Sequence, residues 1–312
     1  MEPTEPRVFF GRRRWLRAAG LGAISLASGG AATWLGYRRF GPPPVAVLPP
    51  IPADVTAAFP GARSSRFGVD EALTAREAAD GYGNFFEFSE DKEGLVEATR
   101  GFVHRPWAVE VRGECHRPGT FDVWDLVRRF GVEERVYRHR CVEAWAMVVP
   151  WSGFPLRALI DAVAPTSRAR FVRFVSFHAP RQAPNQRSTR FAWPYHEGLR
   201  IDEATHPLAF LATGVYGEPL PAAHGAPIRL VVPWKYGFKS MKSIARIELV
   251  RERPPTFWST IAPAEYDFAA NVDPMTPHPR WSQATERMLG TGELRATQLM
   301  NGYVDEVASL YT

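Results

Sequence analysis

Proline and glycine punctuation is the feature that most constrains the fold of this chain. Twenty-eight prolines and 25 glycines are spread along 312 residues. Both residues interrupt regular elements, so we expect a loop-rich protein with many short strands. Strands are predicted at residues 107–112, 137–142, 170–177 and 244–251, where apolar residues alternate or cluster in short runs. The sequence therefore predicts an α+β protein of mixed sheets and short helices.

Two helices are predicted from apolar residues that recur at helical spacing. The first spans residues 120–130 and ends at Gly131, and the second spans 155–163 and ends before Pro165. A further short helix is expected within 66–80, and residues 228–232 alternate as a strand. The stretches 254–258 and 271–286 are expected to be loops. With 45% hydrophobic residues, the chain is long enough for one large or two modest domains.

The net charge of +5 comes from the first 40 residues. These contain seven arginines and two glutamates, so the remaining 272 residues carry 31 basic and 31 acidic groups. Proteins that bind nucleic acid usually carry an excess of positive charge, and residues 41–312 carry none. We therefore expect no nucleic-acid partner.

The same N-terminal segment resembles a twin-arginine export signal. Two adjacent arginines, Arg12 and Arg13, are followed after one residue by Trp15, Leu16 and Arg17. Residues 18–37 then contain no charged residue. We expect residues 1–40 to be an export leader to the periplasm, either removed or retained as a membrane anchor. Residues 41–65 are expected to be a Pro-rich linker, and 66–312 the catalytic domain.

One cysteine lies in an unusual setting. Arg138, His139 and Arg140 directly precede Cys141, and positive charge favours the thiolate form that binds metals or attacks electrophiles. The alternative is a buried structural cysteine, which is what most free cysteines are. The other cysteine, Cys115, permits one disulfide, but two cysteines at this spacing do not make a zinc site.

A second basic stretch follows the strand predicted at 228–232. Three lysines follow Arg229 within 13 residues: Lys235, Lys239 and Lys242. If these basic groups lie close together with Arg229, they form an anion site. The alternative is a solvated basic face.

Two segments together resemble a known family. Residues 138–145 read Arg-His-Arg-Cys-Val-Glu-Ala-Trp, and 150–156 read Pro-Trp-Ser-Gly-Phe-Pro-Leu. They are similar to the molybdenum-binding segment of the sulfite-oxidase-type molybdopterin oxidoreductases, and the wording is nearest to the methionine-sulfoxide reductases among them. The resemblance extends from about residue 82 to the C-terminus. It implies a sulfite-oxidase-type fold around a Mo-molybdopterin cofactor, with Cys141 as the thiolate ligand of molybdenum and the catalytic residue.

The resemblance also implies a set of cofactor-binding residues. These are Gly83, Asn84, Phe86, Glu87, Cys141, Ser176, His224, Arg229, Ser240, Met241 and Lys242. Four of these positions depart from the family pattern. Gly83 replaces an Asn, Phe86 a Tyr, Ser176 a Thr and His224 an Asn.

The activity implied is the molybdenum-dependent reduction of methionine sulfoxide in exported proteins, with electrons from a haem-containing membrane subunit, MsrQ. Trp145, Trp151 and Trp234 are expected to line an open site for a protein substrate. The alternatives are a sulfite oxidase, a reductase of small S- or N-oxides, and an exported interaction module with a buried cysteine. Residues 278–287 also match the family, but no role follows from their sequence.

Overall fold

The computed structural model describes residues 44–60, 62–64 and 67–312. The expected leader, residues 1–40, lies outside this range. The helices are α3 (Ala53–Ala58), α4 (Arg76–Gly81), α5 (Leu95–Ala98), α6 (Val123–Phe130), α7 (Leu156–Val163), α8 (Ile201–Ala204), α9 (Phe257–Ile261) and α10 (Val304–Val307). The 3-10 turns are η1 (Pro184–Arg187), η2 (Ala222–His224), η3 (Gly237–Lys239), η4 (Leu299–Gly302) and η5 (Ala308–Leu310). The strands are β1 (Arg63–Ser64), β2 (Ala108–Gly113), β3 (Gly119–Asp122), β4 (Glu133–Arg140), β5 (Trp145–Pro155), β6 (Phe171–Ser176), β7 (His196–Arg200), β8 (Phe210–Val215), β9 (Glu218–Pro219), β10 (Arg229–Val231), β11 (Ile244–Val250), β12 (Thr285–Met288) and β13 (Leu294–Ala296).

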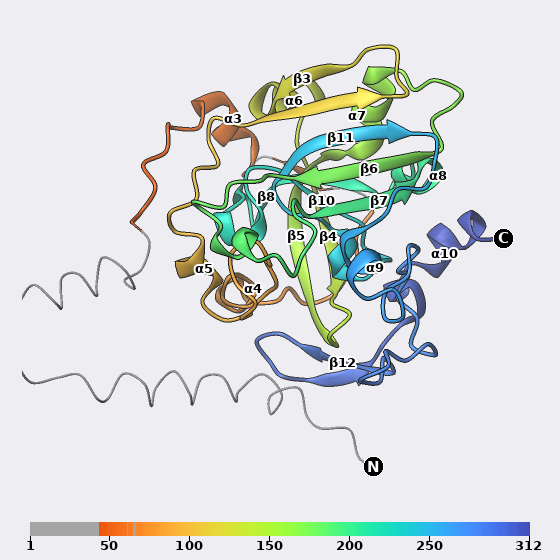
Figure 1. The fold of residues 1–312 in the computed structure, drawn as a ribbon. Coiled ribbons are helices and arrows are strands. Elements are labelled where there is room, and N and C mark those ends of the chain that lie inside the picture. Colours follow the sequence, from red (N-terminus) through yellow and green to blue (C-terminus); the bar gives the residue numbers. More distant parts are fainter. Residues whose placement is uncertain (1–43, 61, 65–66) are drawn as a thin grey trace, which may run out of the picture. The chain divides into compact units, whose positions relative to one another are not determined.

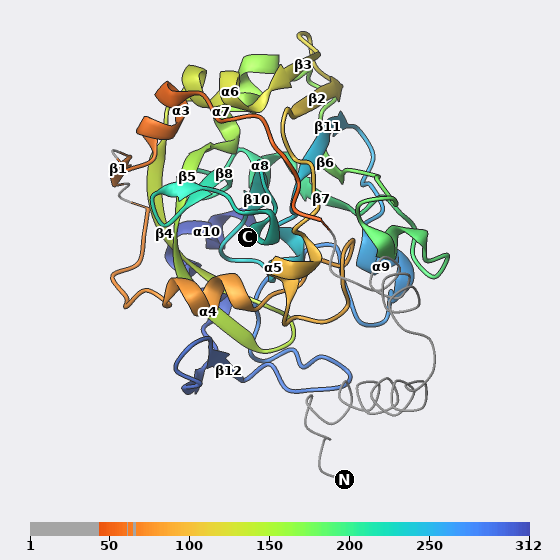
Figure 2. The same ribbon diagram turned by 90° about the vertical axis from the view of Figure 1, so that its left-hand side faces the viewer.

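The strands form two sheets, as the α+β prediction requires. An eight-stranded sheet follows the order β1-β4-β5-β12-β13, with β8 pairing β5 and carrying β9 and β10. A five-stranded sheet has the order β3-β2-β11-β6-β7. Figure 1 shows the five-stranded sheet above the long β4–β5 hairpin, with the β12 region at the far end of that hairpin. Figure 2 shows α4 and α5 together on one side of the molecule.

β5 is the central strand of the larger sheet. It pairs with β4 along one edge, and along the other edge with β12 at its start and β8 at its end. All but the last of its 11 residues are buried, so it lacks the alternation of a half-buried strand. For this reason β5 was not predicted from the sequence, and neither was β8, which is buried throughout.

The segment between β10 and β11 carries the chain from one sheet to the other. β10 pairs with β8 in the larger sheet, whereas β11 lies between β2 and β6 in the smaller one. The connection folds back along β10, since the Leu230 amide donates to the Met241 carbonyl and the Ile244 amide to that of Ile228. Residues 232–243 are thereby held at the junction of the sheets.

The predicted helices are present with adjusted boundaries. α6 begins after Asp122, whose carboxylate accepts from the amides of Trp124 and Asp125, and it ends at Gly131 with φ of 75°. α7 buries Leu156, Leu159, Ile160 and Val163. The prediction of a loop at 254–258 is wrong in part, because α9 begins at Phe257 after the cap residue Thr256.

Part of the expected linker packs as an integral element. The compact unit extends from Pro44 to Thr312. Within it, Val55 and Phe59 of the α3 region are each 1% exposed and belong to the main core. Described residues before residue 66 therefore belong to the same compact unit as those that follow it.

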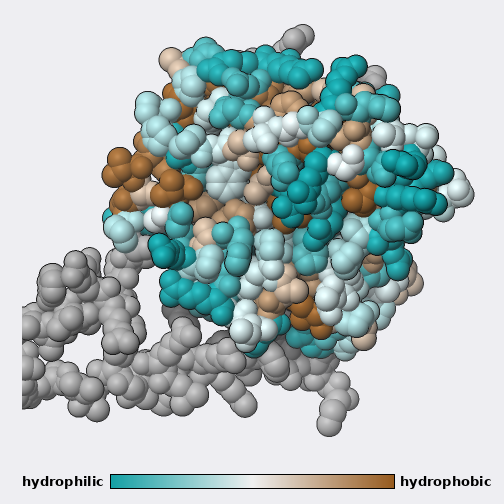
Figure 3. All heavy atoms as spheres, turned by 45° about the horizontal axis from the view of Figure 1, so that its top comes forward, coloured by the Kyte–Doolittle hydropathy of each residue, from teal (hydrophilic) through white to brown (hydrophobic). Residues whose placement is uncertain are grey.

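The surface face shown in Figure 3 is mainly hydrophilic, with brown apolar clusters between the charged groups. Scattered exposure of apolar residues is normal for a globular protein. None of the helices that the structure describes is both long and apolar enough to cross a bilayer.

Candidate active site

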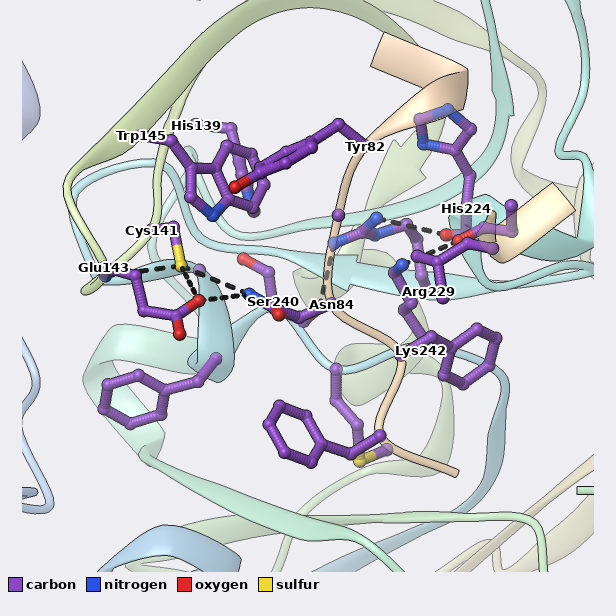
Figure 4. Close-up of a pocket in the computed structure, with 18 of the residues that line it drawn as sticks. Tyr82, Asn84, His139, Cys141, Glu143, Trp145, His224, Arg229, Ser240 and Lys242 are labelled. Atoms are coloured by element: carbon purple, nitrogen blue, oxygen red, sulfur yellow. Dashed lines mark hydrogen bonds between the residues drawn. The ribbon is translucent and has the colours of Figure 1, made fainter. Parts of the chain in front are cut away.

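A pocket opens where the two sheets meet. It encloses about 950 Å³ of space, including a part open to solvent. Its walls come from residues 79–87, from the β4–β5 turn, from η2 and from the connection between β10 and β11. In Figure 4, Cys141, Glu143 and Asn84 gather at one end, and His224, Arg229 and Lys242 at the other. The pocket therefore has a thiol end and a cationic end.

Cys141 lies in the tight turn that joins β4 to β5. Its amide donates to the carbonyl of Trp145, and the amide of Ala144 donates back to the Cys141 carbonyl at 3.0 Å. Ala144 has φ of 64°, a left-handed conformation that a residue with a Cβ adopts only under constraint. The hairpin on either side, with Arg140 opposite Ala146, imposes this conformation. The turn holds the thiol toward the pocket.

The Cys141 sulfur is surrounded by polar groups. Asn84 Nδ2 lies 3.4 Å from Sγ and the Glu143 amide 3.5 Å from it. The Glu143 carboxylate is 3.7 Å from Sγ, accepts from Asn84 at 2.9 Å and forms an ion pair with Lys92 at 3.0 Å. Two N–H groups point at the sulfur, an arrangement that supports a thiolate bound to a metal.

The arginines expected to promote the thiolate are directed to carboxylates instead. Arg138 pairs with Glu71, and Arg140 pairs with Glu286 at 3.0 Å in full burial. Successive side chains of a strand point to opposite faces, so Arg138 and Arg140 share the face away from His139.

The expected lowering of the thiol pKa is wrong for the metal-free chain. Burial, together with the charge of Glu143, raises the pKa of the Cys141 thiol to about 12. Burial also lowers the pKa of His139 well below its ordinary value, with Arg229 and Lys242 adding repulsion. His139 is therefore a neutral imidazole and adds no positive charge beside the thiol.

The stretch 278–287, which had no role from sequence, holds the Cys141 turn in place. The Val142 carbonyl accepts from Trp281 Nε1 and from Gln283 Nε2, both at 2.7 Å. Gln283 Oε1 accepts from Arg140 at 2.9 Å, and the Arg140 guanidinium also donates to the Cys141 carbonyl. These contacts fix the peptide planes on both sides of Val142.

The cationic end is built from Arg229 and Lys242. Arg229 donates to the carbonyls of His224 and Ser240, and Lys242 Nζ to that of Ala223 at 2.6 Å. Within residues 44–60, 62–64 and 67–312, neither cation forms an ion pair with a carboxylate. Burial lowers the pKa of Arg229 to about 9, and burial with repulsion from Arg229 lowers that of Lys242. An anion bound beside these two buried basic groups would favour their charged forms.

A glycine turn permits the Lys242 backbone to lie this close. Gly225 has φ of 93°, and a Cβ there would lie 2.5 Å from Lys242 Cβ. His224, one residue earlier, bonds Asp80 at 2.6 Å through Nε2. Burial lowers the pKa of His224 despite this contact, so the pocket gains a neutral imidazole at this position.

The prediction that all three lysines join the anion site is wrong. Lys235 Nζ pairs with Glu203 at 2.7 Å, and Lys239 Nζ pairs with Glu197 at 2.9 Å, both with fully buried ammonium side chains. Each ion pair neutralises its lysine away from the pocket. Only Lys242 of the three lines it.

The structure brings the remaining predicted residues together. Those that line the pocket are Gly83, Asn84, Phe86, Glu87, Cys141, His224, Arg229, Ser240, Met241 and Lys242. Ser176 does not line it. Its hydroxyl donates to the carbonyls of Lys242 and Ser243 behind the wall. Burial raises the pKa of the neighbouring Glu87 to about 7, against the opposing effects of its hydrogen bonds and of Lys242.

Other expectations for the pocket need correction. Trp145 lines it, but Trp151 and Trp234 are fully buried outside it. The sequence analysis gave no role to Glu143, Lys92 or Tyr266. Glu143 stood inside the family motif and was open to prediction there, whereas Lys92 and Tyr266 come from loops without any local signal.

The donor groups fit a molybdopterin with a phosphate tail. Paired buried cations suit a phosphate, and the soft sulfur of Cys141 suits a transition metal. No three His, Cys, Asp or Glu side chains converge as a metal site in the part of the chain that the structure describes.

Comparisons with known proteins agree with this chemistry. The family model of the oxidoreductase molybdopterin binding domain matches residues 97–258. The protein-methionine-sulfoxide reductase catalytic subunit MsrP of Xanthomonas campestris pv. campestris is 47% identical over 317 residues, which cover 99% of this chain and 94% of that protein. The crystal structure of the sulfane dehydrogenase SoxCD from Paracoccus pantotrophus is similar with a TM-score of 0.43 and 13% identity. The similarity covers 89% of this chain and 64% of that one, and at this level it supports no argument.

The family match confirms the sulfite-oxidase-type fold and Mo-molybdopterin as the cofactor that were expected from the sequence. It also confirms that the chain is an oxidoreductase. The chain belongs to the family of protein-methionine-sulfoxide reductase catalytic subunits, MsrP, among the oxidoreductases with a molybdopterin-binding domain.

Proposed function

We propose that this protein reduces methionine sulfoxide residues of exported proteins to methionine. The observation that carries the proposal is one buried thiol in a constrained turn, opposite two buried cations without a carboxylate partner among the described residues. The similarity to MsrP, whose name specifies protein-bound methionine sulfoxide, supports the same substrate. The net change consumes two electrons and two protons for each sulfoxide and releases a thioether and water.

Cys141 would hold the molybdenum through Sγ, and Arg229 and Lys242 would hold the phosphate of the pterin. When bound, this cofactor supplies two-electron oxygen-atom transfer. Asn84 and the Glu143 amide direct N–H groups at Sγ, at 3.4 and 3.5 Å, and so orient the thiolate. These contacts position the metal ligand before substrate enters.

Two further side chains have protonation states that bear on the reaction, Glu143 and Tyr266. The Glu143 carboxylate lies beside Sγ and is held by Lys92 and Asn84, so it is placed to hold or move a proton at the thiol end of the pocket. Burial, with the charges of Glu143 and Cys141, raises the pKa of Tyr266. Tyr266 therefore remains a neutral phenol, a group that is able to donate a hydrogen bond but does not act as a base.

The electrons would come from a haem-containing membrane subunit, MsrQ, in the periplasm after twin-arginine export. The leader residues 1–40 support this location, because that export route carries proteins already folded around a cofactor.

Metal analysis and dye-driven turnover test the function on wild type and Cys141→Ser. We expect molybdenum and methionine-sulfoxide reduction in the wild type, and loss of activity of about a thousandfold or more in the variant. Sulfite oxidation in place of sulfoxide reduction, or turnover of small S- or N-oxides without any turnover of oxidised protein, would replace the proposed substrate. If the wild-type protein is purified without molybdenum from cells that make the cofactor, a molybdenum-dependent activity is excluded.

A further inference from the structure

A second cavity lies beside the active site. It encloses about 1130 Å³, including a part open to solvent. Its walls come mainly from residues 263–273 and 276–279, together with Gln283 and the start of η4. Val142, Phe238 and Tyr266 line both this cavity and the catalytic pocket. We call it the flanking cavity.

The wall between the two spaces is an aromatic cluster centred on Tyr266. Its ring packs edge-on against Phe238 at 5.3 Å and lies 5.1 Å from the Trp258 ring. On the other side it contacts the His278 ring at 5.6 Å. Trp258 lines only the catalytic pocket and His278 only the flanking cavity. A ligand that passes Tyr266 therefore contacts both spaces at once.

The two spaces differ in charge. The flanking cavity is lined by Glu265, Asp267 and Asp273, and by no lysine or arginine among the described residues. Arg280 neutralises Glu265 at 2.7 Å. Asp267 and Asp273 accept from backbone amides of residues 270 and 275, and neither forms an ion pair within the described parts of the chain. The catalytic pocket in contrast contains the cations described above.

We propose that the flanking cavity receives the polypeptide segment next to the oxidised methionine, and that it favours a segment with a lysine or arginine. The inference rests on the proposed function. A methionine side chain is short, so a sulfoxide at the metal brings its own main chain to the rim of the catalytic pocket. The flanking cavity, which shares Tyr266 with the catalytic pocket, is an adjoining space large enough to hold neighbouring residues.

Charge complementarity selects the segment. Two carboxylates that form no ion pair with the described residues attract a basic side chain and disfavour an acidic one. The attraction weakens as salt screens it. The cavity thereby distinguishes a sulfoxide in a polypeptide from free methionine sulfoxide, because only the polypeptide has flanking residues to bind.

Ala264→Trp tests whether the cavity is used. Ala264 is an exposed residue that lines the flanking cavity but not the catalytic pocket, so an indole there fills the cavity without touching the cofactor. The matched control is Ala57→Trp at an exposed position of α3. The substrates are a methionine-sulfoxide peptide with flanking lysines and N-acetyl-methionine sulfoxide amide, both reduced with a dye.

We expect Ala264→Trp to lower kcat/KM for the peptide at least about tenfold and to leave that for the small amide within about twofold. Ala57→Trp should change neither. Equal losses for both substrates, or no loss for either, would overturn the proposal.

Asp267→Asn/Asp273→Asn tests the charge preference while keeping the oxygen acceptors for the two backbone amides. Wild type should prefer a peptide with flanking lysines over one with flanking glutamates by about fivefold or more at low salt. The double variant should bring this ratio close to one, with kcat for the small amide unchanged. An equal preference in wild type and variant would show that these carboxylates do not select the segment.

The proposed function and the role of the flanking cavity can be contradicted separately. A wild type that reduces neither the peptide nor the small amide contradicts the proposed function. A wild type that reduces both, and responds to neither set of variants, contradicts the flanking cavity alone.

Discussion

Gln283 shows how much of the site depends on single side chains behind it. It is 2% exposed and joins two groups of the catalytic turn, because Oε1 accepts from Arg140 and Nε2 donates to the Val142 carbonyl. Neither contact involves the thiol. Together with Trp281, however, they fix the backbone from which Cys141 projects. We therefore regard Gln283 as a positioning residue.

Gln283→Leu should lower kcat for sulfoxide reduction by about tenfold or more, because a displaced turn misaligns the thiol. The free energy of unfolding should fall by about 1–3 kcal/mol, since buried polar groups lose their partner. Dye-driven kinetics and urea unfolding measure the two effects. The control is Tyr216→Phe, which removes a hydrogen bond to the Thr74 carbonyl outside the pocket. It should lower stability by about 1 kcal/mol with full activity retained. Equal activity in the two variants would contradict the positioning role.

At the scale of elements, charge pairs across strands reinforce the five-stranded sheet. Glu248 on β11 lies opposite Arg112 on β2 and Arg173 on β6. Its two carboxylate oxygens bind these arginines at 2.6 and 2.8 Å. Directly opposite pairs of unlike charge stabilise neighbouring strands. One carboxylate thus connects three strands.

This arrangement predicts a pH-dependent contribution to stability. Burial raises the pKa of Glu248, but the hydrogen bonds from Arg112 and Arg173 outweigh it, and the net pKa is lowered. A lowered folded-state pKa means that the stabilisation is complete above the ordinary glutamate pKa and is lost as the pH falls through the folded value. Glu248→Gln should therefore cost about 1 kcal/mol at pH 7.

Urea unfolding from pH 7 down to the acid limit measures this contribution. The difference between wild type and Glu248→Gln should vanish at the acid end. Glu252→Gln, at an exposed glutamate beside Arg251, should show almost no difference at any pH. A Glu248→Gln difference that stays constant with pH would refute the assignment.

At the scale of the whole molecule, a buried polar cluster ties distant segments together. Lys235 Nζ contacts Glu203 of α8, the Asn271 side chain and the Tyr311 hydroxyl. Tyr311 also accepts from Trp234 Nε1 at 2.8 Å. The C-terminal residues are thereby joined to the connection that leads into the active site.

Breaking this cluster should destabilise the entire unit. Glu203→Gln leaves the Lys235 ammonium buried without its counter-charge, at a cost of about 3–5 kcal/mol in the free energy of unfolding. The double variant Glu203→Leu/Lys235→Met removes both charges and should recover much of that loss, because apolar groups of similar size replace the pair. Chemical denaturation of the three proteins measures this. A double variant less stable than Glu203→Gln would contradict the account.

The sequence by itself determined the fold class, the family and ten of the cofactor-binding candidates that line the pocket. Short alternating runs identified β2, β6 and β11, and helical spacing with a closing glycine identified α6, because these signals are local. The motif around Cys141 sufficed to name the cofactor, since such a long motif reflects common descent. The same local reasoning failed for β5, whose burial on both faces removes the alternation.

Only the tertiary structure decided which of the basic side chains are paired with a carboxylate. Lys235, Lys239 and Lys242 look alike in the sequence, yet the carboxylates that neutralise the first two lie 32 and 42 residues away. The charge environment of Cys141 likewise depends on two distant glutamates. Glu71 forms an ion pair with Arg138, and Glu286 forms one with Arg140. The flanking cavity arises where loops distant in the chain meet. Ion pairs and cavities depend on distances in space, and no local pattern of residues encodes those distances.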